Sequence, residues 1–177
     1  ESEGELLVLR PLGGSDDDAV NARYARLLGS LGRADHPVGA VNEYVETLVT
    51  HGIKHRSSGV RAASVAALAR IGLPGNYDAV RDVAQQDRDE RVRFHALRAG
   101  VALKAAEASG LMIDRLRYDE HPMVREEAAA MLGRFRVEEA LQSLINTLDD
   151  ESWEVCVSVA VSLGKLRRPE GVAPLVE

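Results

Sequence analysis

The chain has 177 residues with 45% apolar content, which is enough material to bury a sizeable core. Its formal net charge of −6 argues against a general nucleic-acid binder, because such a protein attracts phosphates through a basic face. The single cysteine, Cys156, excludes an internal disulfide framework, and neither a membrane span nor a secretory leader is visible, so we expect a cytoplasmic protein.

Residues 1–16 are expected to form an irregular N-terminal arm or linker, because Pro11 stops their short apolar run. The three acidic residues from Asp16 to Asp18 predict a helix start, since they supply an N-cap and suit the helix dipole. The predicted apolar face of this helix consists of Val20, Tyr24, Leu27, Leu28 and Leu31. A second helix is predicted from Pro37 to Gly52, which makes residues 17–52 a divergent first helix pair.

Beyond residue 57 one pattern recurs at an interval of about 32 residues. It is marked by Val60-Arg61, Val92-Arg93, Val124-Arg125 and Val155-Cys156. Each mark opens an apolar run of helical period that a second such run follows, which predicts helix pairs at about 57–86, 89–118, 121–149 and 152–177. The sequence therefore predicts an all-α fold over residues 17–177, an α-solenoid (superhelix) of about five stacked helix pairs.

The helical spacing also predicts a core. The second helices are expected to place Val80, Met112 and Leu144 on one buried line. The first helices are expected to bury Val60, Ser64, Leu68, Ile71, Val92, Ala96, Gly100, Leu103, Val124, Ala128, Leu132 and Phe135. Gly72 and Gly133 stand where left-handed caps would end first helices. We expect Trp153 to anchor its helix on the preceding repeat and Cys156 to be a buried small apolar residue.

One segment carries a family resemblance: Asp119-Glu120-His121-Pro122-Met123-Val124-Arg125-Glu126-Glu127-Ala128-Ala129-Ala130-Met131-Leu132-Gly133. It resembles the signature of HEAT repeats and, more narrowly, is similar to the short HEAT-like repeat first associated with phycobilisome lyases. Asp150 to Gly164 follows the same template, with Cys156 in place of the arginine. The resemblance implies a protein-interaction scaffold or adaptor. The alternative that it implies is a subunit of a bilin (chromophore) lyase, in which Tyr118 or His95 would lie near the pigment.

An acidic residue lies six positions before two of the repeat arginines, Asp87 before Arg93 and Asp119 before Arg125, and Asp150 is in the same place before Cys156. The HEAT resemblance implies a structural ladder of such residues, which bond within and between neighbouring repeats. A guanidinium suits this bridging role because it binds a carboxylate through two parallel hydrogen bonds. The alternative, an anion site built from Arg61, Arg93 and Arg125, is less favoured.

The resemblance further implies that the second helices line the concave side, where ligands bind. Aligned repeats place polar residues there, away from the core line, which predicts a polar to acidic face. The predicted binding residues are Asp78, Asp82, Gln85, Asp114, Arg117, Tyr118, Gln142 and Asn146. A solvated surface is the alternative. Acidity would favour another protein as the partner, recognised through a basic surface or peptide, with no nucleic acid involved.

Enzyme motifs are not evident, and we predict no catalytic residues, no cofactor and no metal site. His51 and His55 have the i, i+4 spacing of a zinc-binding helix, but Gly52 intervenes and a loop is expected there. Some di-iron hydroxylases are built from HEAT-like repeats and resemble this chain in repeat length. Their metal ligands are His-Glu pairs, and that dipeptide is missing from this sequence. A non-enzymatic scaffold is therefore the favoured interpretation.

Overall fold

A computed structural model describes residues 16–32, 38–104 and 106–171. The chain divides into two compact units, unit 1 up to Leu103 and unit 2 from Lys104, and each is described by itself. Every regular element in the described residues is helical, with no strand among them, and this confirms the predicted all-α fold class. The N-terminal arm predicted for residues 1–16 lies almost wholly outside the described residues, as do Pro37 and residues 172–177.

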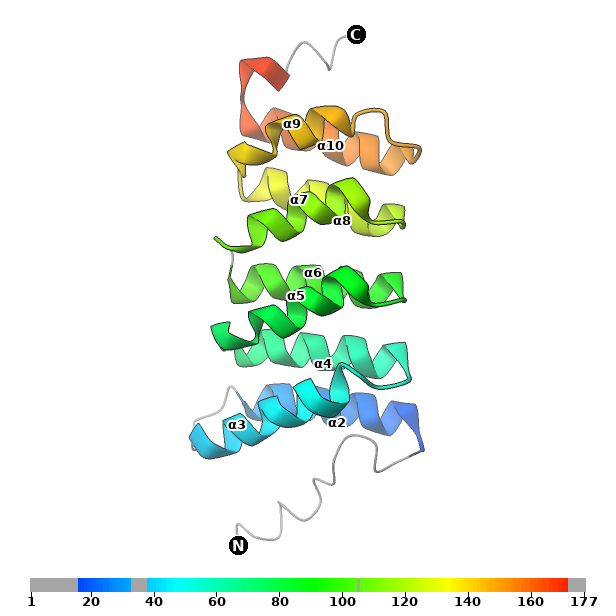
Figure 1. Cartoon of the computed structure of the whole chain (residues 1–177), viewed down its shortest axis with the longest axis vertical. Coiled ribbons are helices and arrows are strands. Elements are labelled where there is room, and N and C mark those ends of the chain that lie inside the picture. Colours follow the sequence, from blue (N-terminus) through cyan, green and yellow to red (C-terminus); the bar gives the residue numbers. More distant parts are fainter. Residues whose placement is uncertain (1–15, 33–37, 105, 172–177) are drawn as a thin grey trace, which may run out of the picture. The chain divides into compact units, whose positions relative to one another are not determined.

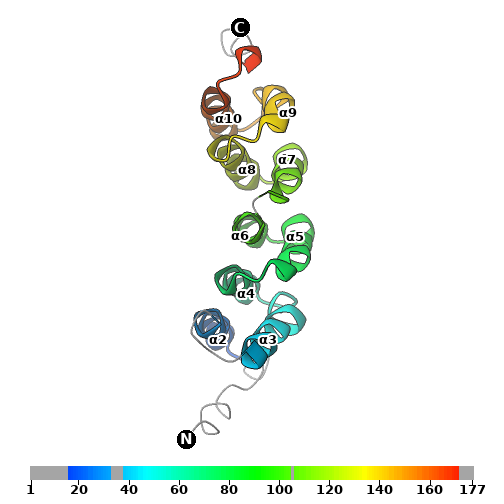
Figure 2. The ribbon, with the colours of Figure 1, turned by 90° about the vertical axis from the view of Figure 1, so that its left-hand side faces the viewer.

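The described residues of unit 1 form five α-helices in two layers. They are α2 (Asp18–Leu31), α3 (Val38–Thr47, continued by a π-helix over Leu48–Gly52), α4 (Ser58–Ile71), α5 (Tyr77–Gln86) and α6 (Glu90–Leu103). The first helices α2, α4 and α6 stack side by side, and α3 and α5 cover one side of that stack (Figures 1 and 2). In this unit neighbouring first helices contact each other, and second helices cover one side of them. This is the arrangement of a helical-repeat solenoid.

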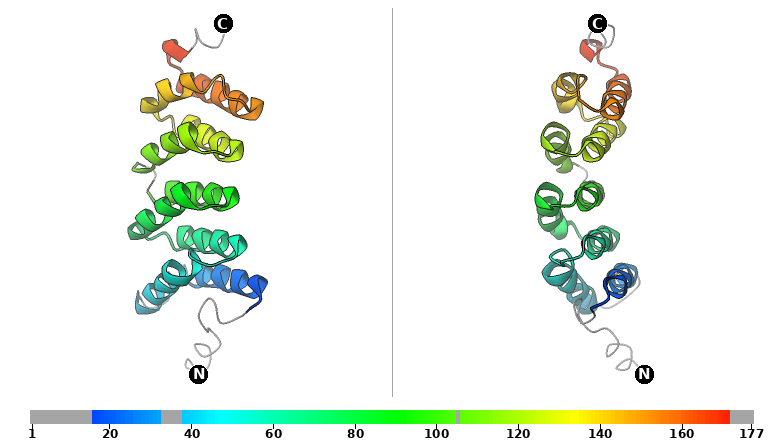
Figure 3. Two further views of the ribbon diagram at one scale, coloured as in Figure 1. Left: turned by 45° about the vertical axis from the view of Figure 1, so that its right-hand side comes forward. Right: turned by 90° about the vertical axis from the view of Figure 1, so that its right-hand side faces the viewer.

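Unit 2 repeats this arrangement, with four α-helices in the part that the structure describes. They are α7 (Ala108–Tyr118), α8 (Pro122–Arg134), α9 (Leu141–Asn146) and α10 (Trp153–Leu166). Helix α8 packs against α10, while α7 packs on α8 and α9 on α10 (Figure 3). Short 3-10 turns over Glu138–Ala140 and Pro169–Gly171 follow the two first helices.

Several local predictions are confirmed. Asp17 caps α2, because its side chain accepts a hydrogen bond from the backbone N–H of Ala19. Gly72 ends α4 with a left-handed φ of 75°. The core line is also confirmed, since Val80, Met112 and Leu144 are fully buried.

The predicted apolar face of α2 is wrong in part. Val20 and Leu27 are exposed, whereas Ala22, Ala25 and Gly29 are buried with Leu28. The reason is close helix packing: a Cβ added at Gly29 would lie only 2.7 Å from the Cα of Ala67 in α4. A contact this short selects small side chains for the interface, so the larger ones turn outward.

Four other expectations fail near the ends of first helices. Gly133 is not a left-handed cap but lies inside α8, where an added Cβ would lie 2.6 Å from the Cα of Ser162. Phe135 follows the end of α8 and is exposed, because its position has left the helical period. Trp153 is exposed rather than packed on the preceding repeat. Cys156 is half-buried rather than buried.

Candidate functional site

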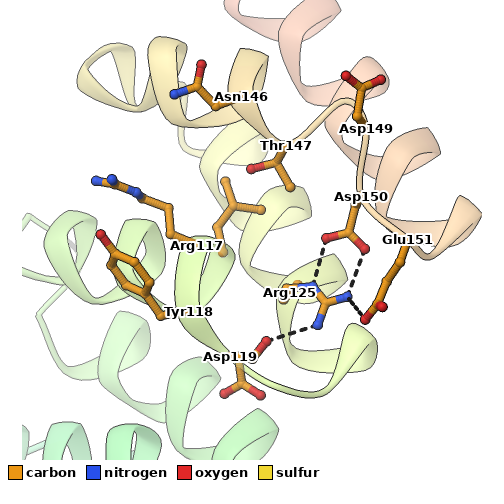
Figure 4. Close-up of a pocket in the computed structure, with 10 residues that line it drawn as sticks. Arg117, Tyr118, Asp119, Arg125, Asn146, Thr147, Asp149, Asp150 and Glu151 are labelled. Atoms are coloured by element: carbon orange, nitrogen blue, oxygen red, sulfur yellow. Dashed lines mark hydrogen bonds and ion pairs between the residues drawn. The ribbon is translucent and has the colours of Figure 1, made fainter.

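A surface pocket of about 410 Å³ lies in unit 2, where the turn from α7 to α8 approaches the turn from α9 to α10 (Figure 4). Its lining residues are Leu116, Arg117, Tyr118, Asp119, Arg125, Asn146, Thr147, Asp149, Asp150 and Glu151. The pocket joins two predicted groups: three of these residues belong to the expected binding face and three to the expected ladder. It is the candidate functional site.

The floor of the pocket is the buried guanidinium of Arg125. Its Nε and Nη2 donate to the two carboxylate oxygens of Asp150, each at 2.8 Å, and Nη2 also donates to Glu151 at 3.2 Å. Its Nη1 donates to the backbone oxygens of Asp119 at 3.0 Å and Glu120 at 3.1 Å (Figure 4). All three nitrogens are engaged with the protein, so the group braces the two turns rather than offering donors to an anion.

The surroundings of Arg125 and Asp150 favour the charged form of both side chains over the neutral form. Burial alone would raise the pKa of Asp150, but hydrogen bonds from Arg125 and the Ser152 N–H, with the arginine charge, lower it below its ordinary value. The hydrogen bond to Asp150 raises the pKa of Arg125. Both groups are therefore ionised at neutral pH and hold the pocket floor in one geometry.

Unit 1 contains the same bracing contact. Arg61 donates to the carboxylate of Asp87 through Nε at 2.7 Å and Nη2 at 2.8 Å, and its Nη1 donates to the backbone oxygen of His55. Arg61 and Arg125 each reach the carboxylate of the following turn, and each also donates to the backbone oxygen six residues before it, that of His55 and that of Asp119. Arg93 makes the same backward contact with the backbone oxygen of Asp87 at 2.8 Å. Arg61 was missing from the predicted ladder, although its place in the repeated Val-Arg pair could have identified it.

Cys156 stands where the repeat has arginine. Its Sγ donates to the backbone oxygen of Asp150 at 3.1 Å. This matches the contact that Arg125 makes with the backbone oxygen of Asp119, six residues before it. A thiol is too short to reach a carboxylate of a following turn as well, so Cys156 cannot make the bridge that Arg125 makes to Asp150.

The rim of the pocket is exposed and polar. The side chain of Tyr118 is 64% exposed, and the guanidinium of Arg117 lies 5.0 Å from its ring centre. Asn146 is exposed and accepts a hydrogen bond from Gln142 at 2.8 Å. Asp149 and Glu151 add exposed carboxylates, which sequence reasoning left out of the site although the acid-rich turn signalled them. A pocket lined by an aromatic ring and by carboxylates can receive a basic side chain.

The other predicted binding residues lie outside this pocket. Asp78 and Asp82 are exposed on α5, and Arg81 bonds to them at 2.8 and 3.2 Å, which offsets part of the acidity expected there. Gln85 is half-buried on α5, and Asp114 is half-buried on α7.

Other classes of site find little support. His51 lies in the π-helix rather than in the expected loop, while Nδ1 of His55 accepts a hydrogen bond from the Ser57 N–H. Within residues 16–32, 38–104 and 106–171, no group of three or more metal-ligating side chains is placed to hold an ion. None of the helices in those ranges is long and apolar enough to cross a membrane.

Comparisons with known proteins agree with this fold. The chain is similar to an engineered protein from the Northeast Structural Genomics Consortium with 20% identity and a TM-score of 0.54, over 93% of this chain and 81% of that one. A second engineered protein from the same consortium has 20% identity and a TM-score of 0.48, over 93% and 49%. At these identities the likeness concerns the fold alone.

The structure of the complex of CpcE and CpcF of phycocyanin lyase from Nostoc sp. PCC7120 also matches, with 21% identity over 86% of this chain and 84% of that one. Its TM-score of 0.30 is too low to support an argument about function. The search of curated proteins gave no match. The family model for HEAT repeats matches residues 7–99 and 111–177. Because these ranges take in most of its length, the chain belongs to the HEAT-repeat family.

Proposed function

We propose that this protein is a non-enzymatic interaction scaffold whose unit 2 pocket binds a basic segment of a partner protein. The observation that carries the proposal is the contrast between floor and rim. The floor is a buried ion pair with its donors engaged, whereas Tyr118, Asp149 and Glu151 stand exposed around it. A braced floor keeps these rim groups in position before binding, which lowers the entropy cost of association.

The class of partner follows from the rim chemistry. A lysine or arginine side chain would reach the carboxylates of Asp149 and Glu151, with its aliphatic stem on the ring of Tyr118. The partner's basic segment would displace Arg117 from that ring or stack beside it. Binding of this kind depends on exposed charges, so it weakens as salt is added.

The test uses fluorescence anisotropy of a labelled arginine-rich peptide, with a glutamate-rich peptide of equal length as the negative probe. We expect the basic peptide to bind the whole protein and Asp149→Lys to weaken binding by at least about tenfold, because the variant reverses a rim charge. Tyr118→Ala should weaken binding as well. The matched control is Glu139→Gln, which changes an exposed acid of unit 2 outside the pocket. Equal binding by Asp149→Lys and the unchanged protein would refute the proposal.

The bilin lyase alternative is not favoured by any specific contact in the described residues. Tyr118 and His95, either of which was expected near a pigment, are both exposed, and exposure alone does not indicate a pigment. We therefore retain the scaffold as the proposed function.

A further inference from the structure

A second pocket, of about 330 Å³, lies in unit 1, where the turn before α4 meets the turn from α5 to α6. The proposed function does not use it. Its floor is the buried pair of Arg61 and Asp87, whose two parallel hydrogen bonds match those between Arg125 and Asp150. The unit 1 pocket is therefore the same kind of repeat junction as the unit 2 pocket.

The rims of the two pockets have opposite charge at equal positions of the repeat. One residue after the aspartate of the floor, unit 1 has Arg88 and unit 2 has Glu151. One residue before that aspartate, unit 1 has Gln86 and unit 2 has Asp149. The turn that supplies two carboxylates to the rim in unit 2 thus supplies a guanidinium and a neutral amide in unit 1.

The other side of the unit 1 rim adds two cations. Lys54 and Arg56 lie in the turn before α4, and both line the pocket. These two residues are exposed, as is Arg88. Nη2 of Arg88 donates to the backbone oxygen of Arg56 at 3.1 Å, which links the two sides of the rim. Three cationic side chains therefore surround a floor whose own charges cancel.

Nearby carboxylates leave most of this positive charge in place. Nε of Arg56 lies 3.8 Å from a carboxylate oxygen of Asp18, but the two side chains are 69% and 47% exposed, and pairs this exposed interact weakly. Asp89 and Glu90 line a neighbouring hollow and not this pocket. Within the part of the chain that the structure describes, the other two cations of the rim form no ion pair with a carboxylate.

The chemistry of the rim favours a phosphate group over a single carboxylate. A phosphorylated serine or threonine has a charge of about −1.5 to −2 and three acceptor oxygens. Guanidinium groups bind such oxygens through paired hydrogen bonds, and a lysine ammonium adds a point charge. Because the donors of the floor arginine are engaged by Asp87 and by backbone oxygens, recognition of the anion depends on the rim cations.

The extent of the basic surface favours a phosphate on a protein segment over a nucleic acid. A nucleic acid presents a row of phosphates and is bound by an extended basic face. Here the formal net charge of the chain is −6, and the three cations gather at one junction. Small arginine clusters of this kind are a general means of recognising phosphorylated peptide segments.

We propose that the unit 1 pocket binds the phosphate group of a phosphorylated serine or threonine in a partner protein, with Lys54, Arg56 and Arg88 as its donors. The bond from Arg88 to the backbone of Arg56 holds the two turns together before the phosphate arrives. This preorganisation lowers the entropy cost of binding.

The first test is fluorescence anisotropy of the whole protein with a labelled neutral peptide that contains one phosphoserine. The same peptide with serine or with aspartate at that position is the comparison, and we expect the phosphopeptide to bind at least about tenfold more tightly than either. Inorganic phosphate should compete with it. A phosphopeptide that binds no better than the aspartate peptide, or a short oligothymidylate of equal charge that binds as tightly, would overturn the proposal.

The second test locates the site. Arg88→Glu reverses one charge of the rim and should weaken phosphopeptide binding by at least about tenfold, and Lys54→Ala should weaken it by at least about threefold. Arg26→Glu is the matched control, because it makes the same change of charge at an exposed position of α2 outside the pocket, and its binding should stay within about threefold of the unchanged protein. Far-UV circular dichroism checks that each variant is folded. Equal weakening by Arg26→Glu and Arg88→Glu, or no weakening by Arg88→Glu, would refute the assignment.

The two pockets can be tested separately, because each has its own probe. Arg88→Glu should leave binding of the arginine-rich peptide unchanged, and Asp149→Lys should leave phosphopeptide binding unchanged, since neither residue lines the other pocket. Failure of the arginine-rich peptide to bind would thus leave the phosphate assignment standing. Loss of phosphopeptide binding in Asp149→Lys would overturn the assignment of the phosphate to unit 1.

Discussion

Replacing Asp150 by asparagine removes the charge from the pocket floor while keeping the shape of the side chain. In the structure the two carboxylate oxygens each accept a 2.8 Å hydrogen bond from Arg125, and one also accepts the N–H of Ser152 at 2.9 Å. An amide offers a single acceptor oxygen, so it can replace only part of this set. The variant therefore leaves a buried guanidinium short of its counter-charge.

The expected loss follows from burial and from the contacts that remain. The side chains of Arg125 and Asp150 are 9% and 8% exposed, so solvent replaces little of the lost interaction. Removing one partner of a buried ion pair costs about 3–5 kcal/mol. Glu151 and the backbone oxygens of Asp119 and Glu120 still accept from Arg125, which reduces the expected loss to about 2–3 kcal/mol in the free energy of unfolding.

The pH dependence has a definite sign. Because the pKa of Asp150 is lower in the folded protein than in the unfolded chain, the carboxylate's stabilising contribution is complete above about pH 4 and is lost as the pH falls through the folded value. Asparagine does not titrate, so the difference between the two proteins should shrink in acid.

Urea unfolding followed by far-UV circular dichroism at about pH 7 and at about pH 3 measures both effects. Asp149→Asn is the control: it alters an exposed neighbour with the same chemistry and should change stability by less than about 0.5 kcal/mol. A loss below about 1 kcal/mol at neutral pH, or a loss that is equally large in acid, would show that the ion pair does not brace the turns.

Two further substitutions test the packing by urea unfolding. Gly133→Ala should destabilise by about 1–3 kcal/mol, because a Cβ 2.6 Å from Ser162 forces α8 and α10 apart by more than the better helix propensity of alanine offsets. Gly110→Ala, in α7 with open space around it, should leave stability equal or raise it by up to about 1 kcal/mol, and a loss there as large as at Gly133 would refute the close-approach argument. Leu144→Ala should cost about 2–5 kcal/mol, because this side chain is fully buried on the core line, and an unchanged urea midpoint would contradict that placement.

Periodicity predicted the parts of this fold that depend on burial of medium-sized apolar side chains. Val80, Met112 and Leu144 are buried as expected, because each lies where the repeat and the helical period agree. The same reasoning failed where backbones approach closely. Helical spacing placed Val20 on the buried face of α2, yet the structure exposes it and buries Ala22, because α2 and α4 approach closely at Gly29.

The failures at helix ends have a different cause. Gly133 has the sequence position of a cap, but its lack of a Cβ is needed for the contact with Ser162, and Arg136 adopts the left-handed φ of 51° instead. A glycine near a helix end can satisfy either need, and a single sequence does not distinguish the two.

The candidate site could be predicted only in part for a related reason. Aligned repeats bring together residues at equal register, which located Arg117, Tyr118 and Asn146 near the ends of second helices. The turn residue Asp149 has no helical register, so its place in the lining of the pocket depends on the course of the turn after α9. That course is held by the bonds from Arg125 to Asp150, which link residues 25 apart.

Recognition at the unit 2 pocket depends on the exposed rim charges, because the hydrogen-bond donors of Arg125 are engaged by the protein itself. Binding of the basic peptide should therefore weaken as salt is added, since mobile ions screen exposed charges. Binding that is equally tight at low and at high salt would mean that apolar contact, and not the rim charge, carries the recognition.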